Sequence, residues 1–309
     1  MLLSDEKKDM IVVCGPTASG KTTLAVTVAC AFNGEIVSAD SRQVYRTMDI
    51  GTGKDLCEYS NDGCAVPYHL IDIAEPAEVY TLYNYKNDFQ RVYKDIHSRG
   101  KVPVITGGTG LYIEAILRNY EIPSIPEDPI LRAELMAKDT PWLEKELETR
   151  AIDLYKKTDL SSKKRIVRAL EIAIHRVIEP EQLKEPSPVL NPVILCTRWN
   201  RQELWKRIDN RLEIRLAEGL LEEVKNLLDS DIPRSRFDLF GMEYKHVAQF
   251  IDGEVSYKQM VQNLKISIHQ LAKRQETWFR GMERRGHTIF WINDARKEDS
   301  FSVLERFTF

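Results

Sequence analysis

Short apolar runs alternate with segments of helical periodicity over the first third of the chain. MIVVC (10–14) is an apolar run that leads into a glycine-rich turn, and apolar residues then recur at helical spacing in KTTLAVTVACAF. Further apolar runs predict strands at EIVSAD (35–40), VPYHLIDI (66–73), KVPVIT (101–106) and PVILCT (192–197). Helices are predicted at about residues 81–98, which Gly100 can end, and at LYIEAIL (111–117). This alternation predicts an α/β fold with a parallel sheet, whose ligands gather at the carboxyl ends of the strands.

The strand pattern stops at about Arg118, and helix-start signals replace it for roughly seventy residues. Asp128-Pro129, Thr140-Pro141 and Ser161 each precede a segment of helical composition. The proline-rich segment EPSPVLNP (185–192) then leads back to a strand. We therefore predict an α/β core made of residues 1–117 and 193–309, with a mostly helical insertion domain at residues 118–192.

Two long helices are predicted after the insertion. Asn200 and Glu203 form a capping-box pattern at the start of the first helix, which Gly219 can end, and Ser256 and Gly281 bound the second. A rotation of about 100° per residue separates two stripes on the second helix. The apolar stripe, expected to face the core, is Met260, Leu264, Ile268, Leu271 and Trp278, and the basic stripe is Lys258, Lys265, His269, Lys273 and Arg280.

Composition and charge exclude several classes of protein. No apolar run is long enough to span a bilayer, and MLLSDEKKDM lacks the regions of a signal peptide, so we expect a cytoplasmic protein. A net charge of −3 argues against a wholly basic nucleic-acid binder but permits local basic patches. The five cysteines lack metal-ligand spacing, so we expect reduced thiols, with Cys14 and Cys30 in the core.

The glycine-rich turn after MIVVC carries the strongest chemical signal. GPTASGKT has the form G-x-x-x-x-G-K-T between a predicted strand and a predicted helix. In such a loop, consecutive backbone N–H groups point at phosphate oxygens where the start of a helix adds positive potential. Lys21 supplies a charge, and the Thr22 hydroxyl can hold Mg²⁺. The predicted phosphate-binding residues are Gly15, Pro16, Thr17, Ala18, Ser19, Gly20, Lys21 and Thr22.

Asp40 is the acidic residue best placed to act beside this loop. A motor or switch ATPase normally has an acid at a second strand end, but here VPVIT ends in GGTG, and Asp40 ends EIVSAD instead. A carboxylate that faces a phosphate site can hold metal or act as a general base for an incoming nucleophile. It can also cap a turn, and the residues alone leave these alternatives open.

Five segments, taken in order, identify a family that this chain resembles. GPTASGKT, SADSRQVYRTMDIGTGK, PYHLIDI, TGGTGLYIEAIL and LAKRQETWFRG resemble the tRNA dimethylallyltransferases, also called tRNA isopentenyltransferases, from Met10 to Asn293. The resemblance implies a P-loop NTPase-like core and a monomer that uses Mg²⁺. It also implies transfer of a dimethylallyl group from dimethylallyl diphosphate to N6 of the adenosine immediately 3′ of the anticodon, in tRNAs that read codons beginning with U.

The resemblance also implies roles for individual residues. The loop would hold the diphosphate leaving group, Asp40 matches the base that accepts a proton from N6, and Thr109 matches a threonine near the reacting groups. Basic residues are dense between Lys156 and Arg168, within the insertion that the family uses to grip the anticodon stem. The implied tRNA contacts are Asp40, Ser41, Arg42, Gln43, Thr109, Arg132, Lys164, Arg165, Arg168, Tyr244, Lys245, Lys273, Arg274, Gln275 and Arg280.

Arg207, Arg211 and Arg215 share one face of the helix that follows Asn200. The family places an arginine from this segment on the diphosphate, which makes Arg207 and Arg211 the candidates. The alternative is a solvated face that pairs with Glu203 and Glu218.

The chain departs from the family pattern at three places. Glu243 stands where glycine is usual in A-I-G-Y-K, and an acid there would repel RNA phosphate. His269 replaces an arginine, which weakens a charge contact. HRVIEPEQL (175–183) stands where a glycine-lysine-proline turn is usual.

Three other functions remain open from the sequence. An adenylate isopentenyltransferase would share fold and donor but modify free AMP, ADP or ATP, without needing the insertion or the basic stripe. A small-molecule or nucleotide kinase would bind ATP in the loop and use Asp40 to activate a hydroxyl. A non-catalytic RNA-binding module would not need Asp40, Thr109 and the phosphate loop together.

Overall fold

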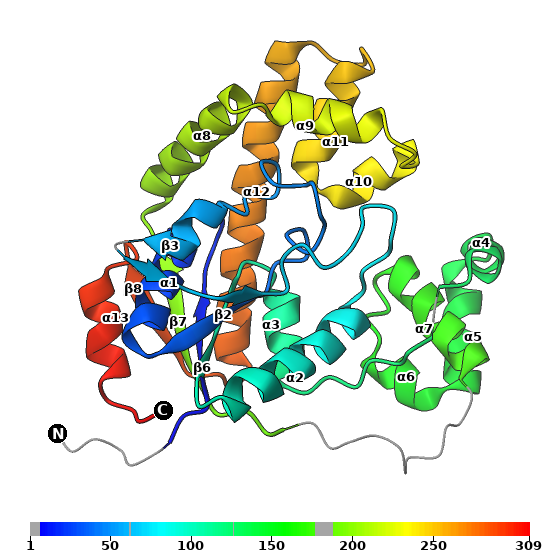
Figure 1. The fold of residues 1–309 in the computed structure, drawn as a ribbon. Coiled ribbons are helices and arrows are strands. Elements are labelled where there is room, and N and C mark those ends of the chain that lie inside the picture. Colours follow the sequence, from blue (N-terminus) through cyan, green and yellow to red (C-terminus); the bar gives the residue numbers. More distant parts are fainter. Residues whose placement is uncertain (1–6, 62, 126, 177–187) are drawn as a thin grey trace. The chain divides into compact units, whose positions relative to one another are not determined.

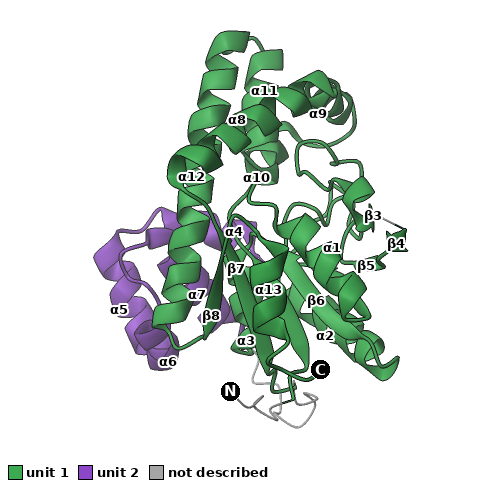
Figure 2. Cartoon of the chain, turned by 90° about the vertical axis from the view of Figure 1, so that its left-hand side faces the viewer, with its two compact units in different colours: residues 1–120, 188–309 green, residues 121–187 purple. Residues whose placement is uncertain are grey.

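The computed structural model of the chain describes residues 7–61, 63–125, 127–176 and 188–309. Contacts divide the chain into two compact units, which Figure 2 colours separately: residues 1–120 with 188–309, and residues 121–187. All but the first two residues of HRVIEPEQL, and residues 185–187 of the proline-rich segment, lie outside the described residues. In the described part of the chain, no helix is long and apolar enough to cross a bilayer.

The first unit is built on a parallel sheet with strand order β5-β2-β6-β1-β7-β8 (Figure 1). Val12 in the buried strand β1 pairs with Ile105 on one side and Ile194 on the other. The predicted strands are confirmed, although only two residues of VPYHLIDI form a strand, and β8 was not predicted. The strands are β1 (Met10–Cys14), β2 (Gly34–Ser38), β5 (Tyr68–His69), β6 (Val102–Gly107), β7 (Pro192–Arg198) and β8 (Ile289–Asn293).

Apolar side chains on the two faces of this sheet pack against different helices, because successive residues of a strand point to opposite faces. Val12 and Ile105 face α2, α3 and the end of α12, while Ile11 and Val104 face α1 and α13. The predicted start of α2 at Thr81 is confirmed by a capping box with Asn84. The helices are α1 (Lys21–Ala31), α2 (Leu82–Ser98), α3 (Gly110–Leu117), α12 (Tyr257–Arg284) and α13 (Lys297–Leu304).

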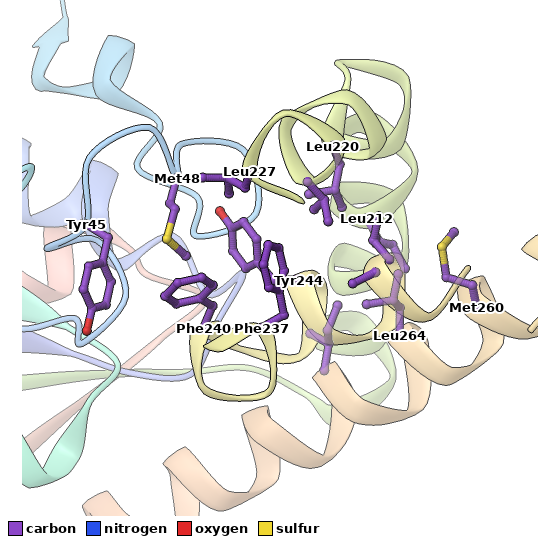
Figure 3. Close-up of a cluster of buried hydrophobic side chains, with 14 of the residues drawn as sticks. Tyr45, Met48, Leu212, Leu220, Leu227, Phe237, Phe240, Tyr244, Met260 and Leu264 are labelled. Carbon is purple, nitrogen blue, oxygen red and sulfur yellow. The ribbon is translucent and has the colours of Figure 1, made fainter. Parts of the chain in front are cut away.

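A second core of the first unit lies among the helices that follow β7 (Figure 3). Tyr45 and Met48, from the loop after β2, pack there against Phe237, Phe240 and Tyr244 (Figure 3). Figure 1 shows the long helix α12 running from these helices to the side of the sheet. The other elements are α8 (Arg201–Ala217), α9 (Leu220–Leu228), a 3₁₀ turn (Arg234–Arg236), α10 (Phe237–Phe240) and α11 (Met242–Ile251).

Asn200 and Ser256 cap α8 and α12 as predicted, since their side chains accept hydrogen bonds from Gln202 N–H and Gln259 N–H. A capping box also predicts a hydrogen bond from the Asn200 N–H to the Glu203 side chain. That part of the prediction is wrong, because the Glu203 carboxylate instead pairs with Lys206 at 2.9 Å. Within the described part of the chain, the start of α8 is therefore capped by one side-chain hydrogen bond, from Gln202 N–H to Asn200.

The second unit is helical in its described residues, with a small apolar core that includes Leu143, Leu147, Ile166 and Leu170. Asp128 caps the first helix as predicted, whereas the second is capped by Asp139, one residue before the predicted start. Its helices are α4 (Pro129–Met136), α5 (Thr140–Arg150), α6 (Ile152–Lys157) and α7 (Lys163–His175).

The prediction of five reduced cysteines is wrong, because Cys30 and Cys64 form a disulfide. Cys30 is exposed near the end of α1, and Cys64 lies in a short hairpin of β3 (Ser60–Asn61) and β4 (Cys64–Ala65) that follows the 3₁₀ turn η1 (Leu56–Tyr59). Cys14 is a buried free thiol, as expected.

Candidate active site

The phosphate loop connects the end of β1 to the start of α1. Gly15 has a φ of +151°, and a β-carbon added there would lie 2.0 Å from Thr197 Oγ1, so only glycine fits. Thr197, in β7, is hydrogen-bonded to Ser19 at 2.6 Å between their hydroxyl oxygens. Thr197 of the neighbouring strand β7 thus constrains both Gly15 and Ser19.

Lys21 is held close to other cations. Its Nζ donates a 3.3 Å hydrogen bond to the carbonyl of Pro16. Burial, and after it the charge of Arg211, lower the pKa of Lys21 to about 8. An anion that enters the loop would relieve both effects, which is the electrostatic signature of a phosphate site.

Asp40 and Thr109 lie in loops that follow adjacent parallel strands, β2 and β6. The Thr109 Oγ1 accepts a 3.1 Å hydrogen bond from Ser41 N–H, and Thr109 N–H donates to the Ala39 carbonyl at 3.2 Å. Asp40 Oδ1 accepts the Arg42 N–H at 2.9 Å, so the carboxylate does cap a turn. Among the described residues, no group donates to its other oxygen, which leaves that oxygen available for chemistry.

The arginines of α8 face the phosphate loop, and the alternative of a solvated face paired with Glu203 and Glu218 is wrong. Arg207 donates from Nε to the Ala18 carbonyl at 2.8 Å and stacks over the Trp199 ring at 4.3 Å. Arg211 forms an ion pair with Asp55. Arg215 is buried, and burial followed by the charge of Arg211 lowers its pKa.

These groups line one cavity of about 850 Å³. The phosphate loop lies on one side, and Asp40 and Thr109 on another. The α8 arginines and the first turn of α11 complete the wall. The lining residues that carry polar chemistry include Lys21, Thr22, Asp40, Ser41, Arg42, Gln43, Asp55, Glu58, Thr109, Arg207, Arg211, Arg215, Glu243, Arg274 and Gln275.

Gln275 joins the two loops through its side-chain amide. Its Oε1 accepts the Thr17 N–H of the phosphate loop at 2.8 Å, and its Nε2 donates to the Gly108 carbonyl at 3.0 Å. Gln43 is also occupied within the chain, between the Ser38 hydroxyl at 3.0 Å and the Gly53 carbonyl at 2.9 Å. Both glutamines hold the cavity wall, a role that the sequence did not reveal.

Comparison with known proteins now decides the family. The family model described as IPP transferase matches residues 43–282. A tRNA dimethylallyltransferase 2 of Trichlorobacter lovleyi is 46% identical over 287 residues, which cover 93% of this chain and 92% of that protein. The chain belongs to the IPP transferase family.

Solved structures agree with this assignment. A tRNA isopentenylpyrophosphate transferase from Bacillus halodurans is 31% identical, with a TM-score of 0.69 and 97% of each chain covered. A eukaryotic dimethylallyltransferase structure at 22% identity has a TM-score of 0.77 and covers 97% of this chain and 77% of that one, which shows a common fold. The predicted P-loop-like core of parallel strands flanked by helices is confirmed.

In this IPP transferase, the A-I-G-Y-K segment does not present Tyr244 to RNA. Tyr244 is fully buried, and its hydroxyl donates to Glu223 Oε1 at 2.7 Å, so the implied contact of Tyr244 with tRNA is wrong. Lys245 is half-exposed and pairs with Asp238 at 3.1 Å. Glu243 lines the cavity, which the sequence did not predict.

Only part of the basic stripe of α12 is free of ion pairs with described residues. Lys265 pairs with Glu213 at 3.0 Å, and His269 bonds to Asp209 at 3.0 Å, so both are tied to α8. Arg280 pairs with Glu276 at 2.6 Å on its own helix. The remaining members of the stripe, Lys258 and Lys273, are exposed, as is the neighbouring Arg274.

The prediction that Trp278 belongs to the core is wrong. Its side chain is 37% exposed and lies against Gly110, where an added β-carbon would come 2.3 Å from the ring. The next residue, Phe279, is fully buried and packs into the core of the sheet. The apolar stripe therefore turns by one residue at this end of the helix.

In the second unit of this IPP transferase, two of the implied tRNA contacts are internal. Arg132 and Arg168 donate to Glu171 Oε2 at 2.8 and 2.6 Å, and Glu171 is fully buried. Arg165 forms an ion pair with Asp159. Lys164 is exposed on α7, and no ion pair of this lysine occurs among the described residues.

Proposed function

We propose that this chain transfers a dimethylallyl group from dimethylallyl diphosphate to N6 of the adenosine immediately 3′ of the anticodon of tRNA. The observation that carries the proposal is the single cavity that joins the phosphate loop and its arginines to Asp40 and Thr109. One side suits a diphosphate anion, and the other offers a carboxylate to an incoming amine. The similarity to proteins named tRNA dimethylallyltransferase supports the same reaction.

The diphosphate leaves as the allylic C–O bond breaks. Backbone N–H groups of the phosphate loop, with Lys21, Arg207 and Arg211, surround the position where its charge increases. Because burial lowers the pKa of Lys21 to about 8, the bound anion restores the full charge of this lysine. No hydrolysis of ATP is required.

Asp40 acts as the general base. The purine N6 is a poor nucleophile because its lone pair is conjugated with the ring. As N6 bonds to the allylic carbon, one N6 proton passes to Asp40 Oδ2, and the electron pair of the broken bond leaves with the diphosphate. The Arg42 N–H holds Oδ1 at 2.9 Å, and Thr109 fixes the same loop through Ser41.

Mg²⁺ fits the oxygen donors of this site. The described residues contain no group of three or more histidine, cysteine or acidic side chains that could hold a metal ion. The Thr22 hydroxyl lines the cavity and makes no hydrogen bond with any described residue, so it can bind the ion together with diphosphate oxygens and water. When bound, Mg²⁺ would neutralise charge on the leaving group.

The acceptor would be a tRNA whose target base has left the anticodon-loop stack, because a stacked base keeps N6 out of reach. The candidates for phosphate contacts are the exposed cations Lys164 and Lys273, together with Arg274 at the cavity wall. We place the enzyme in the cytoplasm as a monomer.

The decisive experiment incubates the protein with dimethylallyl diphosphate, Mg²⁺ and either unmodified tRNA or AMP, followed by nucleoside mass spectrometry. The proposal expects N6-dimethylallyladenosine in tRNA at the position 3′ of the anticodon. Product from AMP alone would identify an adenylate isopentenyltransferase, and consumption of ATP without prenyl donor would identify a kinase.

Asp40→Asn tests the base. This change keeps the size of the side chain and an oxygen for the Arg42 N–H, yet it removes the proton acceptor. Transfer should fall by at least about a hundredfold while tRNA affinity stays unchanged. Asp231→Asn is the matched control, since Asp231 is exposed and does not line the cavity. A large loss of tRNA affinity in Asp40→Asn would contradict this role.

A further inference from the structure

The disulfide between Cys30 and Cys64 is a covalent feature of the first unit that the proposed reaction does not use. Cys30 lies in the last turn of α1, the helix whose first turn carries Lys21 and Thr22 of the phosphate loop. Cys64 lies in β4, in the hairpin that follows η1. The disulfide therefore joins the far end of the phosphate-loop helix to a segment that comes later in the chain.

The covalent ring that this disulfide closes contains part of the cavity wall. The two cysteines are 34 residues apart, and β2, the loop with Asp40, and η1 lie between them. Residues from both ends of this stretch line the cavity: Asp40, Arg42, Gln43, Asp55, Cys57, Glu58 and Tyr59. Breaking the disulfide opens the ring without removing any of these side chains.

The segment around η1 also makes noncovalent contacts close to the phosphate loop. Thr23, in the first turn of α1, donates a 2.9 Å hydrogen bond from its hydroxyl to Glu58 Oε2. Tyr59 is buried in the core on the α1 face of the sheet. Asp55, just before η1, pairs with Arg211, which the proposed reaction uses for the leaving group. A displacement of η1 would therefore change the surroundings of the diphosphate.

The disulfide is accessible to small thiols. Cys30 is exposed, and Cys64 is half-buried beneath the hairpin. Exposed disulfides are reduced more readily than buried structural ones. In the cytoplasm, where we place this enzyme, the disulfides that occur are usually transient and redox-sensing. Accessibility and compartment together indicate a bond that opens and closes.

We propose that Cys30 and Cys64 form a reversible thiol–disulfide site whose oxidised state favours binding of the diphosphate donor. Reduction by a small thiol such as glutathione begins when a glutathione thiolate attacks Cys30 Sγ. The bond between the two protein sulfurs breaks, Cys64 leaves as a thiolate, and a mixed disulfide forms at Cys30. A second glutathione thiolate attacks the glutathione sulfur, which releases glutathione disulfide and the Cys30 thiolate. The two protein thiolates take up the two protons that the glutathione thiols lost, and two electrons pass to the protein.

The direction of the effect follows from order in the cavity wall. In the oxidised protein, the disulfide holds the η1 segment in place before the donor arrives, so binding does not have to order it. In the reduced protein, binding must also order side chains of η1, which lowers affinity by about fivefold. The inference takes its donor from the proposed function and adds a control on the same site.

The first experiment measures the thiol–disulfide equilibrium alone. The folded protein is equilibrated with mixtures of reduced and oxidised glutathione, labelled with a maleimide under native conditions and analysed by peptide mass spectrometry. Labels on Cys30 and Cys64 should appear together as the mixture becomes more reducing, while the buried Cys14 and Cys196 stay unlabelled. A disulfide that persists in reduced glutathione alone would overturn the inference, as would two thiols that stay unpaired in oxidised glutathione alone.

The second experiment measures donor affinity in both states, by calorimetric titration with dimethylallyl diphosphate and with inorganic diphosphate. The wild-type protein should bind both about fivefold more tightly when it is oxidised. Cys30→Ser should bind like the reduced wild type in either buffer. Ala31→Ser is the matched control, since Ala31 is exposed in the same turn of α1, and it should keep the difference. The wild-type comparison needs no substitution, and thermal unfolding curves verify that Cys30→Ser is folded.

Three outcomes of the second experiment would overturn the inference. They are an affinity that is equal in the two states, an affinity that is higher in the reduced state, and a redox response that Cys30→Ser retains. Neither experiment contains RNA, so both are independent of the transfer reaction. A protein that shows the redox response but modifies no RNA would contradict the proposed function and support the thiol–disulfide site.

Discussion

Two groups of arginines in this protein, on α8 and in the second unit, both lie in segments rich in charged residues, but they have different surroundings in the structure. Arg207, Arg211 and Arg215 on α8 face a cavity that contains fewer carboxylates than cations near the phosphate loop. Arg132 and Arg168, in the second unit, converge on the buried carboxylate of Glu171. Arg207 of the first group makes no ion pair with a described residue, although Arg211 pairs with Asp55 at the cavity wall. In the second group both guanidinium groups are bound to one buried carboxylate. A basic residue that is held by a buried carboxylate of its own unit is less able to bind phosphate, whatever the local density of lysine and arginine.

The largest effect should come from Glu171→Ala. This change leaves Arg132 and Arg168 facing a hole and removes the acceptor for Asp128 N–H. Breaking a buried ion pair typically costs 3–5 kcal/mol, and because both arginines reach solvent we expect about 3 kcal/mol of unfolding free energy. Denaturant unfolding measures it, with Glu148→Ala as control, since Glu148 is an exposed glutamate of the same unit. A loss below about 1 kcal/mol would mean that the two arginines are not held by this glutamate.

Arg211→Met should weaken the binding of the diphosphate. The charge-assisted hydrogen bonds of one arginine contribute about 1.5–3 kcal/mol, so the dissociation constant of dimethylallyl diphosphate should rise by about thirtyfold. Calorimetric titration measures this effect. Arg132→Met is the matched control and should leave donor affinity unchanged. An equal loss of donor affinity in both variants would show that the two groups of arginines do not differ in their effect on the diphosphate.

The lowered pKa of Lys21 predicts a dependence of donor affinity on pH. A lysine with a pKa of about 8 is largely protonated at neutral pH and largely neutral one unit above that value. Because the bound diphosphate favours the protonated form, the protein must take up a proton on binding at high pH. Affinity should therefore fall by about tenfold between neutral pH and one unit above the pKa. Lys21→Arg should remove this dependence, since guanidinium does not titrate there.

The smallest effects should come from single exposed lysines. Lys164→Ala and Lys273→Ala each remove one cation without an ion pair among the described residues. Each change should weaken tRNA binding by a few fold and reduce the slope of log affinity against log salt by about one. Arg165→Ala, whose side chain already pairs with Asp159, should change the slope less. If all three slopes equal that of the wild type, tRNA contacts other surfaces.

Local pattern was sufficient for the elements that carry their own signal. MIVVC followed by GPTASGKT, and the caps at Thr81, Asn200 and Ser256, correspond to structure because a strand, a glycine loop or a cap is determined by a few consecutive residues. The length of the strand predicted at VPYHLIDI was overestimated. Its apolar residues are buried partly by loop packing, and only Tyr68 and His69 pair with the edge of β2.

Tertiary contacts explain what the sequence did not show. Cys30 and Cys64 are 34 residues apart, and only the fold brings the hairpin to the end of α1. Trp278 has the right spacing for the core, yet Phe279 takes the buried position because α3 contacts the helix there. The sequence predicted that the arginines of α8 share one face of the helix. That this face meets the phosphate loop depends on a tertiary contact, the stacking of Arg207 on Trp199.

The side chain of Gln275 gives helix α12 control over two loops at once. A single carboxamide binds Thr17 in the loop for the departing anion and Gly108 in the loop before Thr109. A displacement of this helix would therefore act on both loops at once. Under the proposed function, an acceptor RNA that contacts α12 would be coupled through Gln275 to the donor in the cavity, and each would then change the affinity for the other by the same factor.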